Sequence, residues 1–543
     1  MARRVLRAAS VFGEAFWRGG ILALTGGEYK ASEVDEWLGE LMRREIIQRR
    51  DDSRFPSDRE YAFRHAIVRD AAYQMLTPED QALGHRLAAE WLEHAGEHDP
   101  MLLGEHFERG GVGERAAGFY GRAASQALEG NDFVAAKLRA DRAIQAGASG
   151  VEHGNLRLVL AEASRWSGEH DAAREHSYAA MRDLPRGEGD WYVAAAEATE
   201  SAMTLGHVEE ARAVAERVLE VASAGSEQVA AMTTARVIAT SRIATSLGVA
   251  GIYDVAGALL APIDRDEAFI AKDPAARAFL LSANVARASW EGDLEKAAVL
   301  AQEAVGCFEL LGDGRNAARQ RQNAGSALLE LGAYSVAESV LRDARESAER
   351  LGLATVVNDA KLRLGYLYVR TSRREEAVRT TEEVIAAYAA QRDRVGEGRA
   401  RAYLAGVYYF ASENDAAEAE ERRALPLLEH APPYRAALLA FMTLTMLHKG
   451  ASPDESFVVA AEAMRLLSEV GGVAEGEAII RVAYAEALHA KGDVEGARKA
   501  IGAARDRLLA RAAKIKNPEY KRSFLGLIRE HIRTLARAGE WLT

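Results

Sequence analysis

Histidines at helical spacing are the first residues that could do chemistry in this sequence. His94 and His98 lie four residues apart, and His106 follows eight residues later. Two imidazoles one helical turn apart can hold zinc when further ligands complete the set. Gly96 and Pro100 interrupt this stretch, however, and the chain contains no HExxH motif. We therefore predict a helix end followed by a loop here, and no metal site.

Nucleophilic and phosphate-transfer chemistry also lacks its usual motifs. Cys307, the single cysteine, lies in AVGCFELLGD, an apolar helix end where a small thiol packs rather than reacts. The sequence has no GxSxG turn, no GxxxxGK[ST] phosphate loop, no glycine-rich kinase loop and no HRD or DFG motif. Its carboxylates lie in patterns such as RREEAVRTTEEV, which are typical of solvated helix faces. We predict a non-catalytic chain with no cofactor.

Composition and charge favour a folded helical protein. The chain has 543 residues, 48% of them hydrophobic and 28% charged, with only 11 prolines. Its net charge of −12 lacks the excess of Lys and Arg that a duplex-binding surface needs, which argues against nucleic acid as the main partner. No run of about 18 apolar residues is present, so we expect no membrane span. One cysteine and no recognisable cleavage site lead us to expect a cytoplasmic protein.

The elements that carry these residues repeat along the chain. A glycine, or a residue in its place, is followed five places later by a fixed small residue, as in LGHVEEA and LGAYSVA. The pattern recurs in ten copies, at steps of 37 to 45 residues. The fixed position holds Ala136, Ala173, Ala211, Ala256, Ala297, Ala337, Ala377, Ala417, Ser456 and Ala497.

This spacing predicts pairs of antiparallel helices. Glycine ends the first helix because it adopts the left-handed conformation at little cost. The fixed residue then opens the second helix and is small enough for the two helices to approach closely. A second small or aliphatic residue lies seven positions later on the same face, where it can pack against the next repeat. Its ten occupants are Ala143, Ala180, Val218, Ile263, Ala304, Ala344, Val384, Ala424, Ala463 and Ala504.

These units resemble tetratricopeptide repeats (TPRs). In the best copy, DAKLRLGYLYVRTSRREEAVRTTEEV, Leu364, Gly365 and Tyr368 match the first-helix signature and Ala377 opens the second helix. The resemblance covers about residues 117–510, with units of about 40 residues where the family typically has about 34. It implies an all-α solenoid superhelix with a concave groove for a protein or peptide ligand.

In TPRs, particular first-helix positions face the groove, and the same register can be applied to the middle repeats. Aromatic residues and arginines are the usual anchors of protein interfaces. A C-terminal carboxylate clamp of Lys and Asn is not visible, because Gln322 and Ser326 occupy the corresponding positions of one repeat. Packing between adjacent repeats remains the alternative role for the groove candidates, which are Trp290, Gln322, Tyr366, Arg370, Arg399, Tyr409, Phe410, Phe441 and Lys449.

The start of the chain lacks the repeat. Residues 4–12, 15–25 and 32–44 are predicted as three helices, and IIQRR and EYAFRH as the strands of a hairpin. Three helices and a hairpin suggest a small winged-helix-like α+β module. The candidate recognition helix of this module covers residues 32–45 and is acidic. Its acidity argues against DNA binding and favours a role in packing or signal transmission. The acidic side chains are Glu33, Asp35, Glu36, Glu40 and Glu45.

The segment after this module resembles the one that follows the nucleotide-binding module in STAND-type ATPases, including kinase–ATPase–TPR chains and MalT-like regulators. The matching residues are Phe63, His65, Asp70, Tyr73, Leu76, His85, Trp91 and Leu92. The resemblance implies the C-terminal portion of a bacterial signalling protein, or a relative without catalytic modules, with ATPase or kinase modules as partners in cis or in trans. A MalT-like transcriptional regulator, or the regulatory portion of a serine/threonine kinase–ATPase, is the alternative. His65 and His85 are interpreted as structural groups.

The predicted organisation therefore has four parts. A winged-helix-like module covers 1–75, a helical linker 76–116, about ten repeats 117–512, and a capping helix 513–543. The expected function is that of a non-catalytic protein-binding scaffold or sensor. A partner-binding amphipathic helix is the alternative for the last segment, whose apolar face contains Phe524, Ile528, His531, Leu535 and Leu542.

Overall fold

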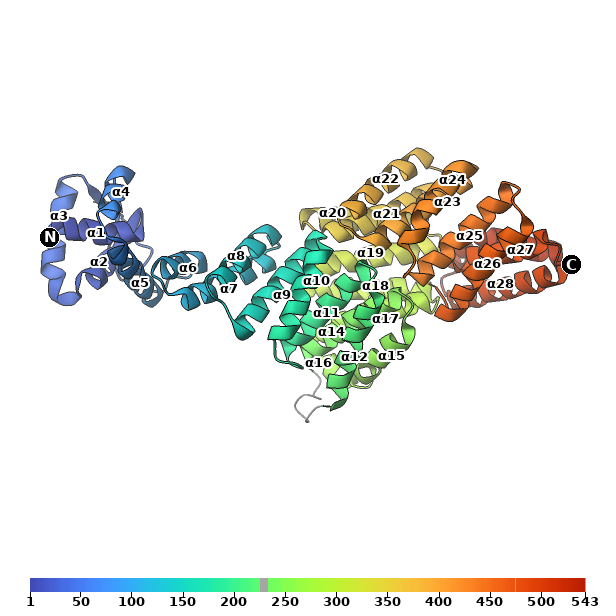
Figure 1. The fold of residues 1–543 in the computed structure, drawn as a ribbon, viewed down its shortest axis with the longest axis horizontal. Coiled ribbons are helices and arrows are strands. Elements are labelled where there is room, and N and C mark those ends of the chain that lie inside the picture. The colour runs from blue at the N-terminus through green and yellow to red at the C-terminus, as the bar shows by residue number, and fades with distance from the viewer. Residues whose placement is uncertain (225–232, 474, 543) are drawn as a thin grey trace. The chain divides into compact units, whose positions relative to one another are not determined.

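The computed structural model describes residues 1–224, 233–473 and 475–542, and the chain divides into two compact units. The N-terminal unit is Met1–Leu160 and the C-terminal unit is Ala161–Thr543. Helix α9 (Gly150–Ser167) contains the boundary. Figure 1 shows that helices dominate both units.

The N-terminal unit opens with helices and a small sheet. The sheet has the strand order β1-β3-β2, and both pairings are antiparallel. The hydrophobic core of the N-terminal unit contains Val5, Phe16, Ile21, Leu38 and Ile47, all nearly inaccessible to solvent. The elements are α1 (Ala2–Phe12), β1 (Ala15–Trp17), α2 (Arg18–Thr25), η1 (Glu28–Lys30), α3 (Ala31–Arg43), β2 (Ile47–Arg49) and β3 (Glu60–Phe63).

The helix predicted over residues 15–25 is wrong at its start. Residues Ala15–Trp17 form strand β1, and helix α2 begins only at Arg18. Two large aromatic side chains explain the extended backbone, because each finds its partner across the sheet. Phe16 stacks on Tyr61 with ring centroids 5.8 Å apart. Trp17 donates a hydrogen bond from Nε1 to Glu60 Oε2 at 3.1 Å.

Helices α4 to α8 complete this unit. Helix α5 ends at His94 and α6 begins at Pro100, so His98 lies in the intervening loop. Within the described ranges, no group of three or more His, Cys, Asp or Glu side chains could hold a metal ion. The helices are α4 (Ala66–Gln74), α5 (Pro78–His94), α6 (Pro100–Arg109), α7 (Gly113–Glu129) and α8 (Phe133–Gln145).

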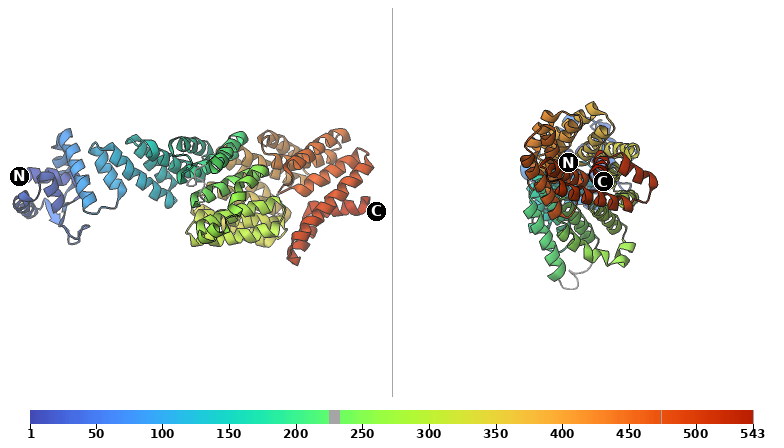
Figure 2. Two further views of the ribbon diagram at one scale, coloured as in Figure 1. Left: turned by 90° about the horizontal axis from the view of Figure 1, so that it is seen from below. Right: turned by 90° about the vertical axis from the view of Figure 1, so that its right-hand side faces the viewer.

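The C-terminal unit consists of successive antiparallel helix hairpins, which Figure 2 shows from green to red. Their bounds are α10 (His170–Asp183), α11 (Gly189–Thr204), α12 (Val208–Ala224), α14 (Thr234–Val249), α15 (Tyr253–Asp264), α16 (Glu267–Lys272), α17 (Pro274–Trp290), α18 (Leu294–Leu310), α19 (Gly314–Glu330), α20 (Tyr334–Arg350), α21 (Ala354–Arg370), α22 (Arg374–Ala390), α23 (Arg394–Phe410), α24 (Asn414–Ala424), η2 (Leu425–Leu427), α25 (Pro432–His448), α26 (Pro453–Val470), α27 (Glu477–Ala490), α28 (Val494–Lys514), α29 (Pro518–Gly526) and α30 (Arg529–Trp541).

The local geometry is that of an all-α TPR-type solenoid. The residue five places before the fixed position has a positive φ in nine copies, including the non-glycine residues Asn131 (φ 62°) and Ser372 (φ 63°). Every fixed residue lies in a second helix with an exposed fraction of 0%. Extended helices account for the long unit, since α19, α20, α21 and α22 have 17 residues each.

Contacts between distant repeats close the C-terminal unit on itself. The hydroxyl of Tyr253 donates a hydrogen bond to the carbonyl of Gly472 at 2.9 Å, across 219 residues. Glu295 Oε2 accepts the backbone N–H groups of Lys516 (2.5 Å) and Asn517 (3.2 Å). Such contacts join early and late repeats of the C-terminal unit across its inner face.

The last segment differs from the single capping helix that we predicted. It contains the end of α28 followed by α29 and α30. Phe524 and Ile528 are buried with Leu294 and Leu331, which belong to much earlier repeats. The segment therefore packs along the inner side of the solenoid as well as on the last repeat.

No helix among the described residues combines the length and the apolar character that crossing a membrane requires.

Candidate functional site

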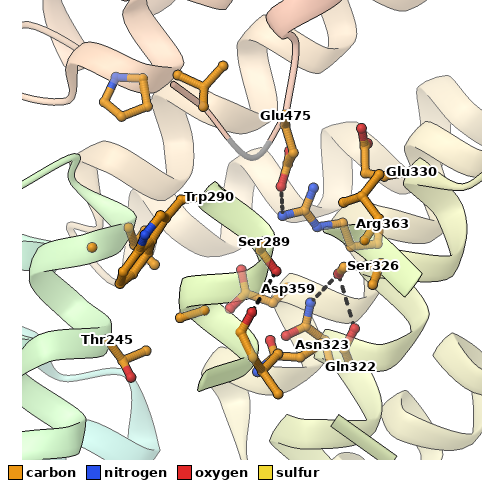
Figure 3. Close-up of a pocket in the computed structure, with 18 of the residues that line it drawn as sticks. Thr245, Ser289, Trp290, Gln322, Asn323, Ser326, Glu330, Asp359, Arg363 and Glu475 are labelled. Carbon is orange, nitrogen blue, oxygen red and sulfur yellow. Dashed lines mark hydrogen bonds and ion pairs between the residues drawn. The ribbon is translucent and has the colours of Figure 1, made fainter. Parts of the chain in front are cut away.

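A cavity of about 270 Å³ lies on the inner face of the C-terminal unit. Its walls come mainly from the first helices of successive repeats, α14, α17, α19, α21, α23 and α25, and from the chain just before α27. Figure 3 shows that polar side chains from several of these elements converge on it. A site on this face is shared by repeats that are far apart in the sequence.

One wall is aromatic, and a glycine makes room for it. A Cβ atom added to Gly248 of α14 would lie 1.8 Å from Cζ3 of Trp290, so the indole of α17 packs against bare backbone. Tyr253 lies beside it, with ring centroids 4.9 Å apart. Pro433 and Tyr434 of α25 continue the lining. The cavity thus has a largely apolar, aromatic side.

Two ion pairs form the opposite side. Arg363 of α21 pairs with Glu475, and its Nη1 also donates to the Tyr403 hydroxyl at 2.6 Å. Arg399 of α23 pairs with Asp359. Burial disfavours the charged form of Glu475, but the attraction of Arg363 outweighs it and keeps the pKa of this carboxyl below its ordinary value. The Arg363–Glu475 pair is therefore charged and mutually neutralised.

Glu330 is the third carboxylate of the cavity. In the part of the chain that the structure describes, no hydrogen-bond or ion-pair partner is found for its side chain, and Figure 3 shows it beside Arg363 without a connecting line. Burial, followed by the charge of Glu475, raises the pKa of Glu330 to about 7, against the opposing effect of Arg370 and Arg363. Its negative charge is thus poorly compensated within the protein.

Helix α19 adds a polar stripe that ends at this carboxylate. Gln322, Ser326 and Glu330 follow one another at intervals of four residues, so they share one helix face. The Gln322 side-chain amide donates a hydrogen bond to Ser326 Oγ at 2.9 Å. The Ser326 hydroxyl in turn donates to the backbone carbonyl of Gln322 at 3.0 Å. These bonds fix the orientation of the stripe toward the cavity.

Five of the nine predicted groove residues lie at this site. Trp290, Gln322 and Arg399 line the cavity itself. Tyr366 and Phe441 line an adjoining cavity of about 40 Å³, which shares Glu330, Arg399, Tyr434 and Glu475 with the first.

The other four predicted residues are engaged elsewhere. Arg370 pairs with Glu530 of α30, and its side chain is only 4% exposed. Tyr409 accepts a hydrogen bond from Arg533 Nη1 at 2.6 Å, and Phe410 faces the guanidinium of Arg529 at 5.0 Å. Helix α30 therefore covers these three positions. Lys449 instead pairs with exposed Asp415 and with Glu418, at 2.5 and 2.6 Å.

Sequence reasoning did not select Glu330, Asp359, Arg363 or Glu475. Glu330 lies seven residues before the fixed Ala337 and thus occupies the same repeat position as Trp290. It was not predicted as a groove residue because only aromatic residues and arginines were expected as interface anchors. Asp359 likewise occupies the repeat position of Arg399. Glu475 lies before α27 and outside the helical register, so no periodic signal could have found it.

The N-terminal unit contains a second cavity, of about 350 Å³, lined by Tyr73, His85 and His106. Tyr73 Oη lies 2.8 Å from His85 Nε2, and His85 Nδ1 lies 3.0 Å from His106 Nδ1. Burial lowers the pKa of His85 to about 4 and that of His106 to about 3, so both rings are neutral near pH 7. His85 therefore has both ring nitrogens occupied, whereas His65 is exposed.

Comparisons with known proteins give matches at low similarity only. Neither a protein-family model nor a curated protein sequence matches it. A STAND protein with a tetratricopeptide repeat sensor from Pyrococcus horikoshii matches at 12% identity and a TM-score of 0.37, over 87% of this chain and 64% of that one. This chain thus spans less than two thirds of the length of that protein.

Two further solved structures are similar over larger parts of their own chains. A Rap protein complexed with Competence and Sporulation Factor matches at 13% identity and a TM-score of 0.42, over 72% of this chain and 99% of that one. The APC/C hetero-tetramer Cut9–Hcn1 matches at 11% identity and a TM-score of 0.45, over 88% and 92%. At these values no function is transferred from the three proteins.

Proposed function

We propose that the C-terminal unit binds an extended segment of another protein, with side chains of that segment entering the inner cavity. The observation that carries the proposal is the cavity itself, with an aromatic wall around Trp290 facing convergent polar groups. A volume of about 270 Å³ is of the size that side chains of a peptide occupy. The proposal narrows the groove-binding function predicted from the repeats to the binding of an extended peptide segment.

The proposed role is non-catalytic. No histidine or cysteine is among the described residues that line the cavity, and Arg363 and Arg399 each pair with a carboxylate. Ser326 Oγ donates its proton to the backbone carbonyl of Gln322 within its own helix and is not hydrogen-bonded to a base. Among the described residues that line the cavity, no hydroxyl is hydrogen-bonded to an unpaired base, which supports binding over chemistry.

Filling the cavity tests this proposal. We expect Ser326→Tyr on α19, and independently Ser289→Phe on α17, to abolish capture of partner proteins from a lysate of the native host, as read by affinity purification and mass spectrometry. Ala389→Tyr adds a similar ring on the exposed face of α22 and serves as the matched control. Circular dichroism establishes that each variant is folded. Partner capture that both filled variants retain would show that the cavity is not the binding site.

For the N-terminal unit we propose a packing or signal-transmitting role in a larger cytoplasmic signalling protein of the STAND type, with ATPase or kinase modules as partners in cis or in trans. Helix α3 supports this role because it is acidic, and the nearby cation Arg18 is already bound to Asp35 at 2.7 and 2.9 Å. A winged-helix regulator that binds DNA is the competing proposal. A salt-dependent gel shift on genomic fragments separates the two, and no shift is expected even at low salt.

A further inference from the structure

The charges of the inner cavity do not balance. Three carboxylates line it, those of Glu330, Asp359 and Glu475, against the two guanidiniums of Arg363 and Arg399. Each guanidinium already pairs with a carboxylate, which leaves Glu330 as the surplus anion. Glu330 is half-buried, and partial withdrawal of an unpartnered carboxylate from water raises the free energy of the folded state.

The cation nearest in the repeat register does not compensate this carboxylate. Arg370 lies one repeat further on at the position equivalent to Glu330, but both of its Nη atoms bind the carboxylate of Glu530 at 2.5 Å. Arg363 is held by Glu475 and Tyr403. Arg511 of α28 also interacts with the charge of Glu330, but its nearest carboxylate contact is with Glu477 at 3.5 Å. Among the described residues no cation forms an ion pair with Glu330, so a cation brought by a ligand would meet an unpaired carboxylate.

We propose that the inner cavity is a subsite for a basic side chain, a lysine or an arginine, of the bound peptide. The proposal rests on the peptide-binding function argued above and names the chemistry of the ligand. Glu330 binds the ammonium or guanidinium group, and the indole of Trp290 lines the same cavity, where an aromatic ring attracts a cation.

The neighbouring groups fit an extended backbone beside that side chain. Gln322, Ser326 and Glu330 form a row that spans about 12 Å along α19, since a helix rises about 1.5 Å per residue. Amide and hydroxyl groups along this row can bond the polar groups of a peptide main chain. The charged end of the row then selects the basic side chain, and the polar part positions the segment on either side of it.

Blocked peptides test the inference on the full chain. The probes are Ac-Gly-Arg-Gly-NH2 and its uncharged isostere with citrulline, and free Gly-Gly-Gly supplies an N-terminal ammonium as the alternative cation. We expect the arginine probe to bind at least about tenfold more tightly than the citrulline probe at pH 8, by NMR titration. The triglycine arm distinguishes a side-chain cation from a chain terminus.

The matched variants decide the assignment. Glu330→Gln keeps the shape of the side chain and removes the surplus charge, so it is expected to fold and to lose the preference for arginine. Glu382→Gln alters an exposed carboxylate on α22 and should retain the preference. Equal binding of the arginine and citrulline probes, absence of binding up to 10 mM (about the weak end of specific binding), stronger binding of triglycine, or an unchanged preference in Glu330→Gln overturns the inference.

Failure of this inference is distinguishable from failure of the proposed function. If Ser326→Tyr abolishes partner capture while Glu330→Gln leaves it intact, the cavity binds protein without a basic subsite. If neither change affects capture, the cavity itself is not the binding site.

Discussion

At the residue scale, Glu330 is the group whose protonation should report on the cavity. It faces Arg363 and Arg370 of α21, Glu475 before α27, Arg511 of α28 and Glu530 of α30. Burial and the two neighbouring carboxylates raise its pKa in the folded protein to about 7, against an ordinary value of 4.5. The unfolded chain therefore releases this proton first as pH rises. Its contribution to stability is complete below about pH 4.5 and is lost as pH approaches about 7.

The raised pKa of Glu330 leads to a prediction about how stability depends on pH. Relative to the wild type, Glu330→Gln should have a similar free energy of unfolding near pH 4.5 and a higher one at pH 8, by about 1–3 kcal/mol. Urea denaturation at the two pH values measures the difference, and comparison of the two proteins cancels other titrating groups. A variant that is less stable than the wild type at pH 8 would contradict the assignment of an uncompensated charge.

At the scale of the elements, the residue that joins the two helices of a repeat has different surroundings in different copies. Gly332 has a φ of +75°, and a Cβ atom there would lie 3.0 Å from the carbonyl oxygen of Ser523 in α29. Gly492 has a φ of +90° and nothing within 4 Å of that position. The two glycines share the backbone requirement, but only the first is also approached by another segment.

Alanine at these two positions should separate the two effects. Gly492→Ala is expected to cost about 1 kcal/mol for the left-handed conformation alone. Gly332→Ala should cost at least about 1 kcal/mol more, because the added methyl group displaces α29. The measurement is the free energy of unfolding in urea. Equal losses would show that α29 does not pack on the turn after α19.

Local pattern explains what the sequence could predict at this scale. A glycine and an alanine at fixed spacing define a helix hairpin through contacts within one repeat, so the hairpins and their register followed from the residues. The same register identified Trp290, Gln322 and Arg399 as inward facing. Contacts that span about 110 to 220 residues have no periodic signature. For this reason the closing of the solenoid, the position of Glu475 and the covering of Arg370 by α30 could not be predicted.

At the scale of the whole C-terminal unit, the last helix is built into the inner face. Glu530 of α30 pairs with Arg370 of α21, and the two side chains are 9% and 4% exposed. Arg533 of the same helix pairs with Glu486 of α27 and donates to Tyr409 of α23. Helix α30 thus joins three first helices that are separate in the sequence. Reversing the charge of Arg370 would disrupt this junction rather than test a ligand site.

The Arg370–Glu530 pair therefore gives the sharpest test of this arrangement. Glu530→Gln leaves a buried guanidinium uncompensated and should lower the free energy of unfolding by about 3–5 kcal/mol. The exposed pair of Arg465 and Glu469 on α26 is the control, and Glu469→Gln should cost less than about 0.5 kcal/mol. The double variant Arg370→Met with Glu530→Leu removes both charges and should recover much of the loss. A mild effect of Glu530→Gln, equal to that of the control, would mean that α30 does not bury this pair. Recovery in the double variant would show that α30 is held on the inner face by its fit as well as by its charge.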